Sequence, residues 1–363
     1  MSIPWYRYFA RSRPVKEGQV AAYIKDKVKD LGLKVFEDRA GKELGSDTGN
    51  LIISSSKGRG EPLFLSSHMD TVQVCLDKEV PVLISRDRID TGGVSILGSD
   101  DKVGIAAALE MLTVAVEKPE IARPLDLIFT IKEERGALGS GFLNPEHIQS
   151  RYGFNLDGET PVYSAIREAP AKARYNILIH GKSAHAALNP EEGINAVRIA
   201  GKIINKLPDG RIDSMSVANT AYVAGGGATN VVPDRAEING EFRSLDKLKF
   251  TKIKENILNT VASGAESDGG QAEIAIMELY KGYYLNDDEI CVSLFSEACK
   301  SIGKKPLLLR SLGGGDSNQF NNKGMRNLVF GFGMESIHSK DEYIVISRVI
   351  EAAALLERTI FFV

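Results

Sequence analysis

Cysteine is scarce in this chain, and long apolar runs are missing. The three cysteines, Cys75, Cys291 and Cys299, show neither the spacing of a zinc ribbon nor that of a disulfide framework. No apolar run reaches the roughly eighteen residues that would suggest a membrane span, and the first fourteen residues lack the apolar core of a secretion signal. We therefore expect a cytoplasmic protein with no membrane partner.

The chain also lacks a large excess of charge of either sign. The net charge is −3 and no basic stripe is present, which argues against nucleic acid or an anionic membrane as a partner. With 43% hydrophobic and 26% charged residues the chain is typical of a soluble globular protein. Its 363 residues are too many for one ordinary core and contain no repeats, so we expect two domains.

The pattern of apolar and polar residues changes twice along the chain. In residues 1–168 and again in 283–363, short apolar strands alternate with amphipathic helices, as in an α/β domain. Residues 169–282 instead carry half-exposed strands and two amphipathic helices with a pattern of their own. These residues have the length of an ordinary domain, so the sequence predicts an α+β domain inserted into a discontinuous α/β domain.

Acidic residues and histidines follow the apolar strands. Carboxyl ends of strands are where open α/β sheets place their sites. The His-x-Asp spacing at His68 and Asp70 lets a carboxylate hold one imidazole nitrogen while the other binds metal. The complete set of strand-end and helix-start candidates is His68, Asp70, Asp100, Glu133, Glu134, Asp157 and His338.

Taken singly, these residues have ordinary explanations. Asp100 and Asp101 could simply cap the helix that they open, and adjacent glutamates such as Glu133 and Glu134 are usually exposed. Together, two histidines and several carboxylates without cysteine suit Zn²⁺, Co²⁺ or Mn²⁺. Two such ions about 3.5–4 Å apart can clamp both oxygens of a hydrolytic displacement.

A series of motifs gives the chain a family resemblance. It resembles peptidase T and the wider metallopeptidase family that contains aminoacylases and glutamate carboxypeptidases, over about His68 to His338. The motifs, in their order along the chain, are HMDTV, GSDDKVGIA, FTIKEERGALGS, NLDGE, GKSAHAALNPEEGINA, GGGATNVVPDRA, GEFRS, GGGDSN and IHSKDEY.

The resemblance implies the fold and the metal centre. The expected fold is an α/β, mixed-sheet dinuclear metallopeptidase domain with an inserted α+β lid or dimerisation domain. Two divalent ions per subunit are expected, with zinc first and cobalt or manganese as alternatives. Asp70 would orient His68, and Glu133 would be the general base that activates the metal-bridging water. The implied ligands are His68 and Asp157 for one ion, Glu134 and His338 for the other, and Asp100, followed by a cis peptide bond, for both.

The resemblance also assigns roles in the lid domain. His185 would stabilise the oxyanion, and the backbone of Gly313, Gly314 and Gly315 could cradle the substrate. Asn230 and Arg243 would bind polar or carboxylate ends of a peptide. Outside its motif, Arg243 would be interpreted first as an ordinary ion-pair arginine, and Asn230 could be a turn residue. A homodimer through the lid is a further implication.

The predicted function is that of a dinuclear metal-dependent exopeptidase on short peptides, of aminopeptidase or tripeptidase type. Aspartate at Asp157 favours this over the alternative, an N-acyl amino-acid deacylase or carboxypeptidase, where the family has glutamate. The third alternative is a catalytically silent homologue that binds peptides. The presence of the expected residue at all seven site positions argues against it. Lys132 departs from the family pattern, and the chain is shorter than peptidase T, which leaves the tripeptide-length restriction open. His147 and His180 match no family site and are interpreted as structural or surface residues.

Overall fold

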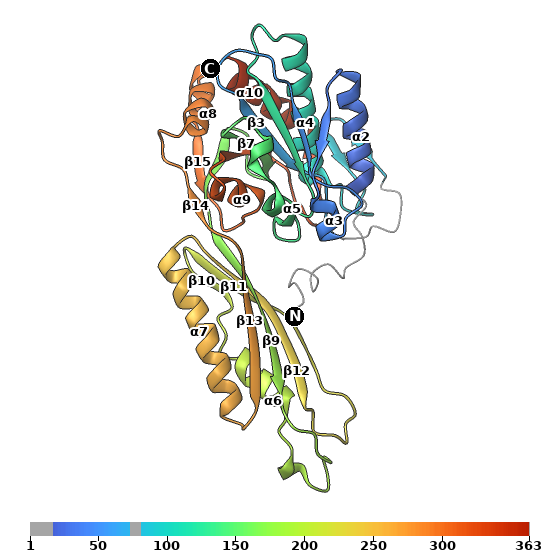
Figure 1. Cartoon of the computed structure of the whole chain (residues 1–363), viewed down its shortest axis with the longest axis vertical. Helices are drawn as coiled ribbons and strands as arrows, with labels where there is room; N and C mark the ends of the chain where they lie inside the picture. Colours follow the sequence, from blue (N-terminus) through green and yellow to red (C-terminus); the bar gives the residue numbers. More distant parts are fainter. Residues whose placement is uncertain (1–16, 73–80, 363) are drawn as a thin grey trace. The chain divides into compact units, whose positions relative to one another are not determined.

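The computed structural model describes residues 17–72 and 81–362, and its chain divides into two compact units (Figure 1). Unit 1 comprises the chain up to Glu168, Tyr284–Arg310 and the part from Gly315 onward. The insert comprises Ala169–Tyr283 together with Ser311–Gly314. Within the described part of the chain, no helix has the length and apolar character needed to cross a membrane. Cys291 and Cys299 are buried free thiols, and Cys75 lies outside the described residues.

Unit 1 is built on a mixed nine-stranded sheet. Its four central strands, β6, β3, β7 and β16, run parallel to one another, while β1, β2 and β8 join antiparallel. The strands in spatial order are β1 (Val35–Glu37), β2 (Leu51–Ser54), β6 (Leu125–Thr130), β3 (Leu63–His68), β7 (Tyr152–Gly158), β16 (Arg326–Gly331), β8 (Ser164–Ala169) and β14 (Tyr283–Tyr284), with β15 (Leu307–Arg310) paired to β8.

Helices cover both faces of this sheet, so β3 and β6 are buried along their whole length. Phe64 of β3 packs against Phe320 of α9. On the opposite face Phe154 contacts Phe330, which packs on Phe295 of α8. The helices of unit 1 are α2 (Glu17–Asp30), α3 (Ala40–Leu44), α4 (Ser99–Glu117), α5 (Leu138–Phe142), α8 (Ile290–Ser301), α9 (Asp316–Asn322) and α10 (Ile346–Phe361).

The insert is an antiparallel five-stranded sheet with two helices on one face (Figure 1). Alternate residues of β9, from Ala173 to Ile179, are buried against the helices, which gives the period-two pattern of a sheet covered on one side. The strands in spatial order are β10 (Gly210–Asp213), β11 (Ser216–Gly225), β12 (Arg235–Ser244), β9 (Ala171–His180) and β13 (Gln271–Tyr280), and the helices are α6 (Ala196–Ile204) and α7 (Lys247–Glu266).

The expected fold class, a mixed-sheet α/β domain with an inserted α+β domain, is confirmed. The predicted bounds of the insert, 169–282, stay a prediction, and the compact unit differs from them by Tyr283 and Ser311–Gly314. The sequence pattern also predicts a turn over 313–318 and a last helix over 343–360, and the structure differs from both. The turn expected over 313–318 becomes α9 from Asp316, because the buried Phe320 and its neighbours pack on β16. The last helix begins at Ile346, because β17 (Tyr343–Val345) pairs with β5 (Arg88–Asp90), which in turn pairs with β4 (Leu83–Ser85).

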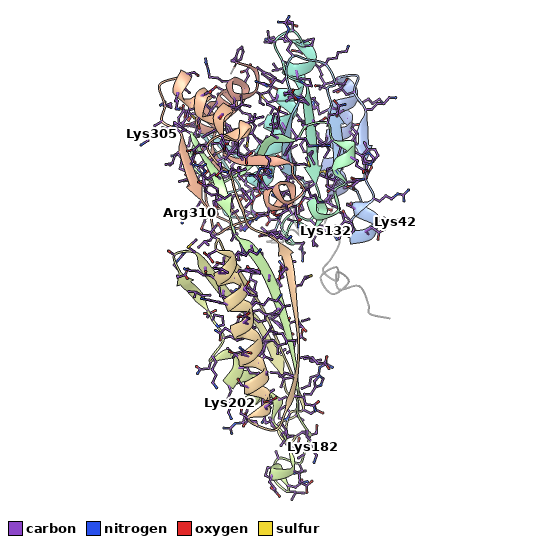
Figure 2. The ribbon with its side chains drawn as sticks, turned by 60° about the vertical axis from the view of Figure 1, so that its left-hand side comes forward. Lys42, Lys132, Lys182, Lys202, Lys305 and Arg310 are labelled. Atoms are coloured by element: carbon purple, nitrogen blue, oxygen red, sulfur yellow. The ribbon has the colours of Figure 1, made fainter. Side chains whose placement is uncertain are left out.

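The first turn of α2 anchors the segment that carries Glu133. Glu17 is buried, and its Oε1 accepts a 2.8 Å hydrogen bond from the backbone N–H of Lys132, while Ser46 donates to its Oε2. Lys132 has a φ of +52°, in the left-handed region that non-glycine residues rarely adopt. Its ammonium group donates to the carbonyls of Leu44 and Gly45 at the end of α3. Figure 2 labels Lys132 beside Lys42 of that helix. The departure from the family pattern at Lys132 is thus stabilised by Glu17 and α3.

Replacement of Glu17 by glutamine should change the pH dependence of stability. Burial, with the charge of Asp70 nearby, raises the pKa of Glu17 from 4.5 to about 7. Between these values the unfolded chain has released the proton that the folded chain retains, so this carboxyl lowers stability as the pH rises through 7. We expect Glu17→Gln to gain on the order of 1–3 kcal/mol over wild type at pH 8 and little at pH 5.

The measurement is the midpoint of thermal unfolding at several pH values, with Glu43→Gln, an exposed change on α3, as the control. The control should show no pH-dependent difference from wild type. An equal difference between Glu17→Gln and wild type at pH 5 and pH 8 would contradict the explanation.

Candidate metal centre

The four central strands bring the predicted metal ligands to one edge of the sheet. Parallel strands place their carboxyl ends at the same edge, which is where open α/β sheets bind ligands. The strand ends and loops that follow β6, β3, β7 and β16 bring Glu134, His68, Asp157 and His338 together, with α4 adding Asp100. Residues from five distant parts of the sequence thus meet at the sheet edge.

The two oxygens of Asp100 face different partners. Oδ1 lies 2.7 Å from Nε2 of His68, and that nitrogen is 3.8 Å from Oδ1 of Asp157. Oδ2 lies 3.0 Å from Nε2 of His338, which is also 3.0 Å from Oε1 of Glu134. Asp100 therefore lies between two histidines, each with a second carboxylate nearby. The two groups adjoin, because the ligand atoms of His68, Asp100 and Glu134 also lie within 4.8 Å of one another.

This donor set fits two divalent cations. Ligand atoms about 2.0–2.1 Å from one tetrahedral ion lie roughly 3.3 Å apart, close to the 2.7–3.8 Å separations within each group. Among the described residues no cysteine joins the cluster, so its nitrogen and oxygen donors suit zinc, cobalt or manganese. His68 and Asp157 would hold one ion, Glu134 and His338 the other, and Asp100 both.

Asp101 is the neighbour that could compete with Asp100 as a ligand, because it too lies near His68 and Asp157. Its carboxylate, however, accepts from the backbone N–H groups of His68, at 3.3 Å, and Gly104, at 3.2 Å. Those bonds direct Asp101 toward the start of α4 and leave the central position to Asp100. The peptide bond between the two aspartates is cis, as expected.

Asp70 connects the end of strand β3 to the segment that follows strand β6. Its carboxylate accepts from the backbone N–H groups of Glu133, at 2.9 Å, and Glu134, at 3.1 Å. Nδ1 of His68 is 3.0 Å from the carbonyl oxygen of Asp70 and 3.4 Å from its carboxylate. Asp70 thus fixes the histidine ring and the two glutamates together, with its carbonyl oxygen as the nearer partner of the ring.

Glu133 lies next to Glu134, among several other carboxylates. Burial, reinforced by the carboxylates of Asp316, Glu134 and Asp70, raises the pKa of Glu133 well above its usual range. A methyl group added at Gly315 would lie 2.0 Å from Oε1 of Glu133, so a larger residue there would push this carboxylate out of its present position. Gly315 is therefore positioned to admit Glu133, in addition to the backbone role expected for the glycine run.

The charges of the cluster are matched to cations. Although burial opposes it, hydrogen bonds to the carboxylates of Asp100 and Asp70 raise the pKa of His68 well above its usual range. Hydrogen bonds to Asp100 and Glu134 raise the pKa of His338 to about 10. Burial, followed by the charge of Asp100, raises the pKa of Asp157. Each group is shifted toward binding positive charge, which is the environment that a divalent ion requires.

The insert carries His185 and Asn230 on neighbouring loops. Nδ1 of His185 accepts from the backbone N–H groups of Ala187 and Leu188, both at 3.2 Å. Because Nδ1 is an acceptor, the proton of a neutral ring lies on Nε2. The backbone N–H of Ala186 donates to the carbonyl of Asn230 at 3.0 Å, which joins the two loops. Figure 2 labels Lys182, at the start of the His185 loop, near one end of the insert.

Arg243 makes an ion pair within the insert, which agrees with its interpretation as an ordinary ion-pair arginine. Its guanidinium donates to Oε1 of Glu241 at 2.6 and 2.9 Å and to the carbonyl of Leu312 at 3.3 Å. Glu241 also faces Lys172, at 2.9 Å, and Arg174, at 3.9 Å. The cluster therefore sets three cationic groups around one carboxylate, beside the Gly313–Gly314 backbone.

Several residues near the centre were not recognised from the sequence. Glu342, in the IHSKDEY motif, is buried, and its carboxylate accepts a hydrogen bond from the backbone N–H of Ser99, the residue before Asp100. Asp316, in GGGDSN, accepts from Thr130 and, at 2.5 Å, from Ser140. The motifs contained both acids, but nothing local distinguished them from exposed ones. Of the two histidines interpreted as structural, His147 stacks near Phe36 and His180 lies 3.3 Å from Glu273.

Comparisons with known proteins agree with this arrangement. Residues 50–178 match the model of the peptidase family M28, and residues 170–269 match that of a peptidase dimerisation domain. The uncharacterised protein YqjE of Bacillus subtilis (strain 168) is 34% identical over 94% of this chain and 91% of its own length.

Two solved structures are similar over almost the whole chain. The aminopeptidase PepT of Bacillus cereus ATCC 10987 is 32% identical, with a TM-score of 0.84 over 98% of this chain and 96% of that one. A tripeptidase of Staphylococcus aureus subsp. aureus Mu50 is 30% identical, with a TM-score of 0.88 over 98% and 95% of the two chains.

Removal of the Asp100 carboxylate should release both metal ions together. Each ion would lose one oxygen, so Asp100→Ala should bind close to none where the wild type binds two. Asp157→Ala should retain the ion held by Glu134 and His338. Metal analysis after dialysis, combined with titration, measures both, and Glu159→Ala is the control because Glu159 is an exposed acid two residues after Asp157. One tight, fully occupied ion in Asp100→Ala would contradict the bridging assignment.

Proposed function

The chain belongs to the dinuclear metallopeptidase family that includes peptidase T, and from that premise we propose that it is an aminopeptidase of short, tripeptide-like substrates. One observation carries the proposal. The two oxygens of Asp100 each face their own histidine and carboxylate, which is the arrangement that two hydrolytic metal ions need. The aminopeptidase and tripeptidase similar to this chain support the peptide as substrate.

The chain's own residues would hold the ions and the reacting water. Bound divalent ions would polarise the peptide carbonyl and acidify water. Glu133 would take the proton from the attacking water and deliver it to the leaving amine. Burial and the neighbouring carboxylates raise the pKa of Glu133, which makes its carboxylate a stronger proton acceptor. Asp70 holds the backbone of Glu133 and Glu134, so base and ligand keep a fixed separation.

His185 is proposed as the donor to the oxyanion. The backbone N–H groups of Ala187 and Leu188 leave the proton on Nε2, so the ring is prepared to donate before substrate arrives. The role requires that the insert of the same chain, or that of a second copy, bring this histidine to the scissile carbonyl. The match to a dimerisation domain supports the second copy, so we also propose a homodimer.

The cationic cluster of the insert would receive the carboxylate end of the peptide. Arg243 has a planar guanidinium suited to a carboxylate, and Lys172 and Arg174 help to balance the charge of Glu241. Burial, then the charge of Arg243, lowers the pKa of Lys172 to about 8, so an additional negative charge there would be favourable. Asn230 and the backbone of Gly313–Gly315 would hold polar groups of the peptide.

The proposal is tested by a screen of free tripeptides, dipeptides and N-acetyl amino acids with Zn²⁺, Co²⁺ and Mn²⁺. We expect release of the N-terminal residue from tripeptides. Hydrolysis of N-acetyl amino acids alone would favour a deacylase. Absence of all hydrolysis with two ions bound would indicate a catalytically silent homologue.

In the same assay Glu133→Gln should lower kcat by about 10²–10⁴-fold, the range of general-base catalysis. Its metal content should equal that of the wild type, because Glu133 is not proposed as a ligand. Near-normal kcat with both ions bound would remove Glu133 from its role.

His185→Ala should lower kcat by roughly 10²–10³-fold, the scale for one lost oxyanion donor. Metal content and fold should not change. His180→Ala is the matched control, since His180 belongs to the same insert and pairs with Glu273 instead. If the two variants kept the same kcat as wild type, His185 would have no part in the chemistry.

A further inference from the structure

Glu342 is a buried acid close to the metal centre for which the proposed chemistry has no use. Its side chain is 1% exposed, and it follows His338 by four residues. Acids are rarely buried unless their oxygens are paired. The partners of this carboxylate lie more than 240 residues earlier in the sequence, in the segment that leads into Asp100.

The carboxylate of Glu342 is surrounded by backbone donors. Oε2 accepts from the N–H groups of Leu97, at 2.7 Å, and Gly98, at 2.9 Å. Oε1 accepts from the N–H of Ser99 at 2.7 Å and from its hydroxyl at 2.5 Å, with the N–H of Asp100 at 3.4 Å. Both oxygens are therefore used in holding the backbone immediately before and at Asp100.

Glu342 itself belongs to the loop that carries His338. Glu335 and Tyr343 pair through two backbone hydrogen bonds of 3.1 and 3.2 Å, which closes the base of this loop. Tyr343 continues into β17, paired with β5. His338 has a φ of +62°, so the loop holds it in a conformation that favours glycine. Glu342 sits at the closed base, between His338 and β17.

Two links thus connect the Asp100 and His338 segments. One runs through the centre itself, where Oδ2 of Asp100 lies 3.0 Å from Nε2 of His338. The other runs behind it, from Glu342 to the backbone of residues 97–100. We infer that Glu342 is the positioning residue of the metal centre, which sets the separation of Asp100 and His338 and so determines the affinity for the ion that these two residues share.

This inference rests on the proposed metal centre and extends it to a residue that touches neither ion. Charge-assisted hydrogen bonds are about twice as strong as neutral ones, so the Glu342 contacts can hold the Asp100 backbone against the repulsion of the surrounding carboxylates. Removal of a partner that orients a metal ligand typically costs 10–100-fold in affinity. The ion that Asp100 shares with Glu134 and His338 should weaken most, because both of its connected segments depend on Glu342.

The test is the affinity of each ion in Glu342→Gln, measured by competition with a chromophoric chelator for Zn²⁺ and by the absorption of bound Co²⁺. The amide keeps the size of the side chain but turns an NH₂ group toward backbone N–H donors. We expect one ion to bind 10–100-fold more weakly than in wild type and the other to change less. Asp341→Asn is the matched control, an exposed neighbour that loses the same charge, and should bind both ions as wild type does.

Far-UV circular dichroism establishes that the variants are folded. A folded Glu342→Gln that binds both ions with wild-type affinity overturns the inference, even if its melting temperature is lower, because that would be a purely structural role. If Glu342→Gln does not fold, Glu342→Asp decides, since it keeps the charge but is one methylene too short. Weaker binding of one ion supports the inference, and wild-type affinity for both overturns it.

These readouts are independent of substrate. If wild type binds two ions but hydrolyses no peptide, the proposed function fails and the Glu342 result still stands. If wild type hydrolyses tripeptides and Glu342→Gln binds both ions normally, the positioning role fails and the proposed function stands.

Discussion

The central constraint on this protein is the repulsion among the carboxylates gathered at one sheet edge. Asp100, Glu133, Glu134 and Asp157 would separate if each were free to reach water, and nearby histidines only partly balance them. Divalent cations would relieve this repulsion, because one cation can bind two neighbouring carboxylates at once. The rest of unit 1 can be understood as a scaffold that holds these acids together until the ions bind.

The parallel strands provide the first part of that scaffold. β3 and β6 are buried over their whole length, and such strands have little freedom to shift without opening the core. Residues placed at their ends inherit this rigidity, whereas the segment after β6 needs further anchors. Asp70 and Glu17 provide them through the backbone of Glu133, Glu134 and Lys132.

The residues that sequence analysis located correctly at the sheet edge share one property. His68, Glu134 and Asp157 each follow an apolar run, and such runs report strand ends without knowledge of the tertiary structure. The metal ligands were then named by resemblance, and their roles are still to be tested. Glu342 was quoted within a motif but given no role, because its partners are distant backbone groups that leave no pattern near it. The helix at Asp316 was missed for a related reason, since its packing on β16 outweighs the local turn signal of three glycines.

The partners of the supporting acids point to a common physical reason. Asp70, Glu17 and Glu342 are held mainly by backbone N–H groups, which orient a carboxylate through dipoles without adding a full positive charge. A lysine or arginine in those places would compete with the incoming metal for the same field. Lys102 and Lys132 also lie near these acids, but their ammonium groups donate to the backbone carbonyls of Gly98, Leu44 and Gly45. In the insert, three cationic groups surround Glu241, where a peptide carboxylate is the proposed ligand. The carboxylates of the metal centre would thus stay available to cations, whereas the cationic groups around Glu241 would suit an anionic ligand.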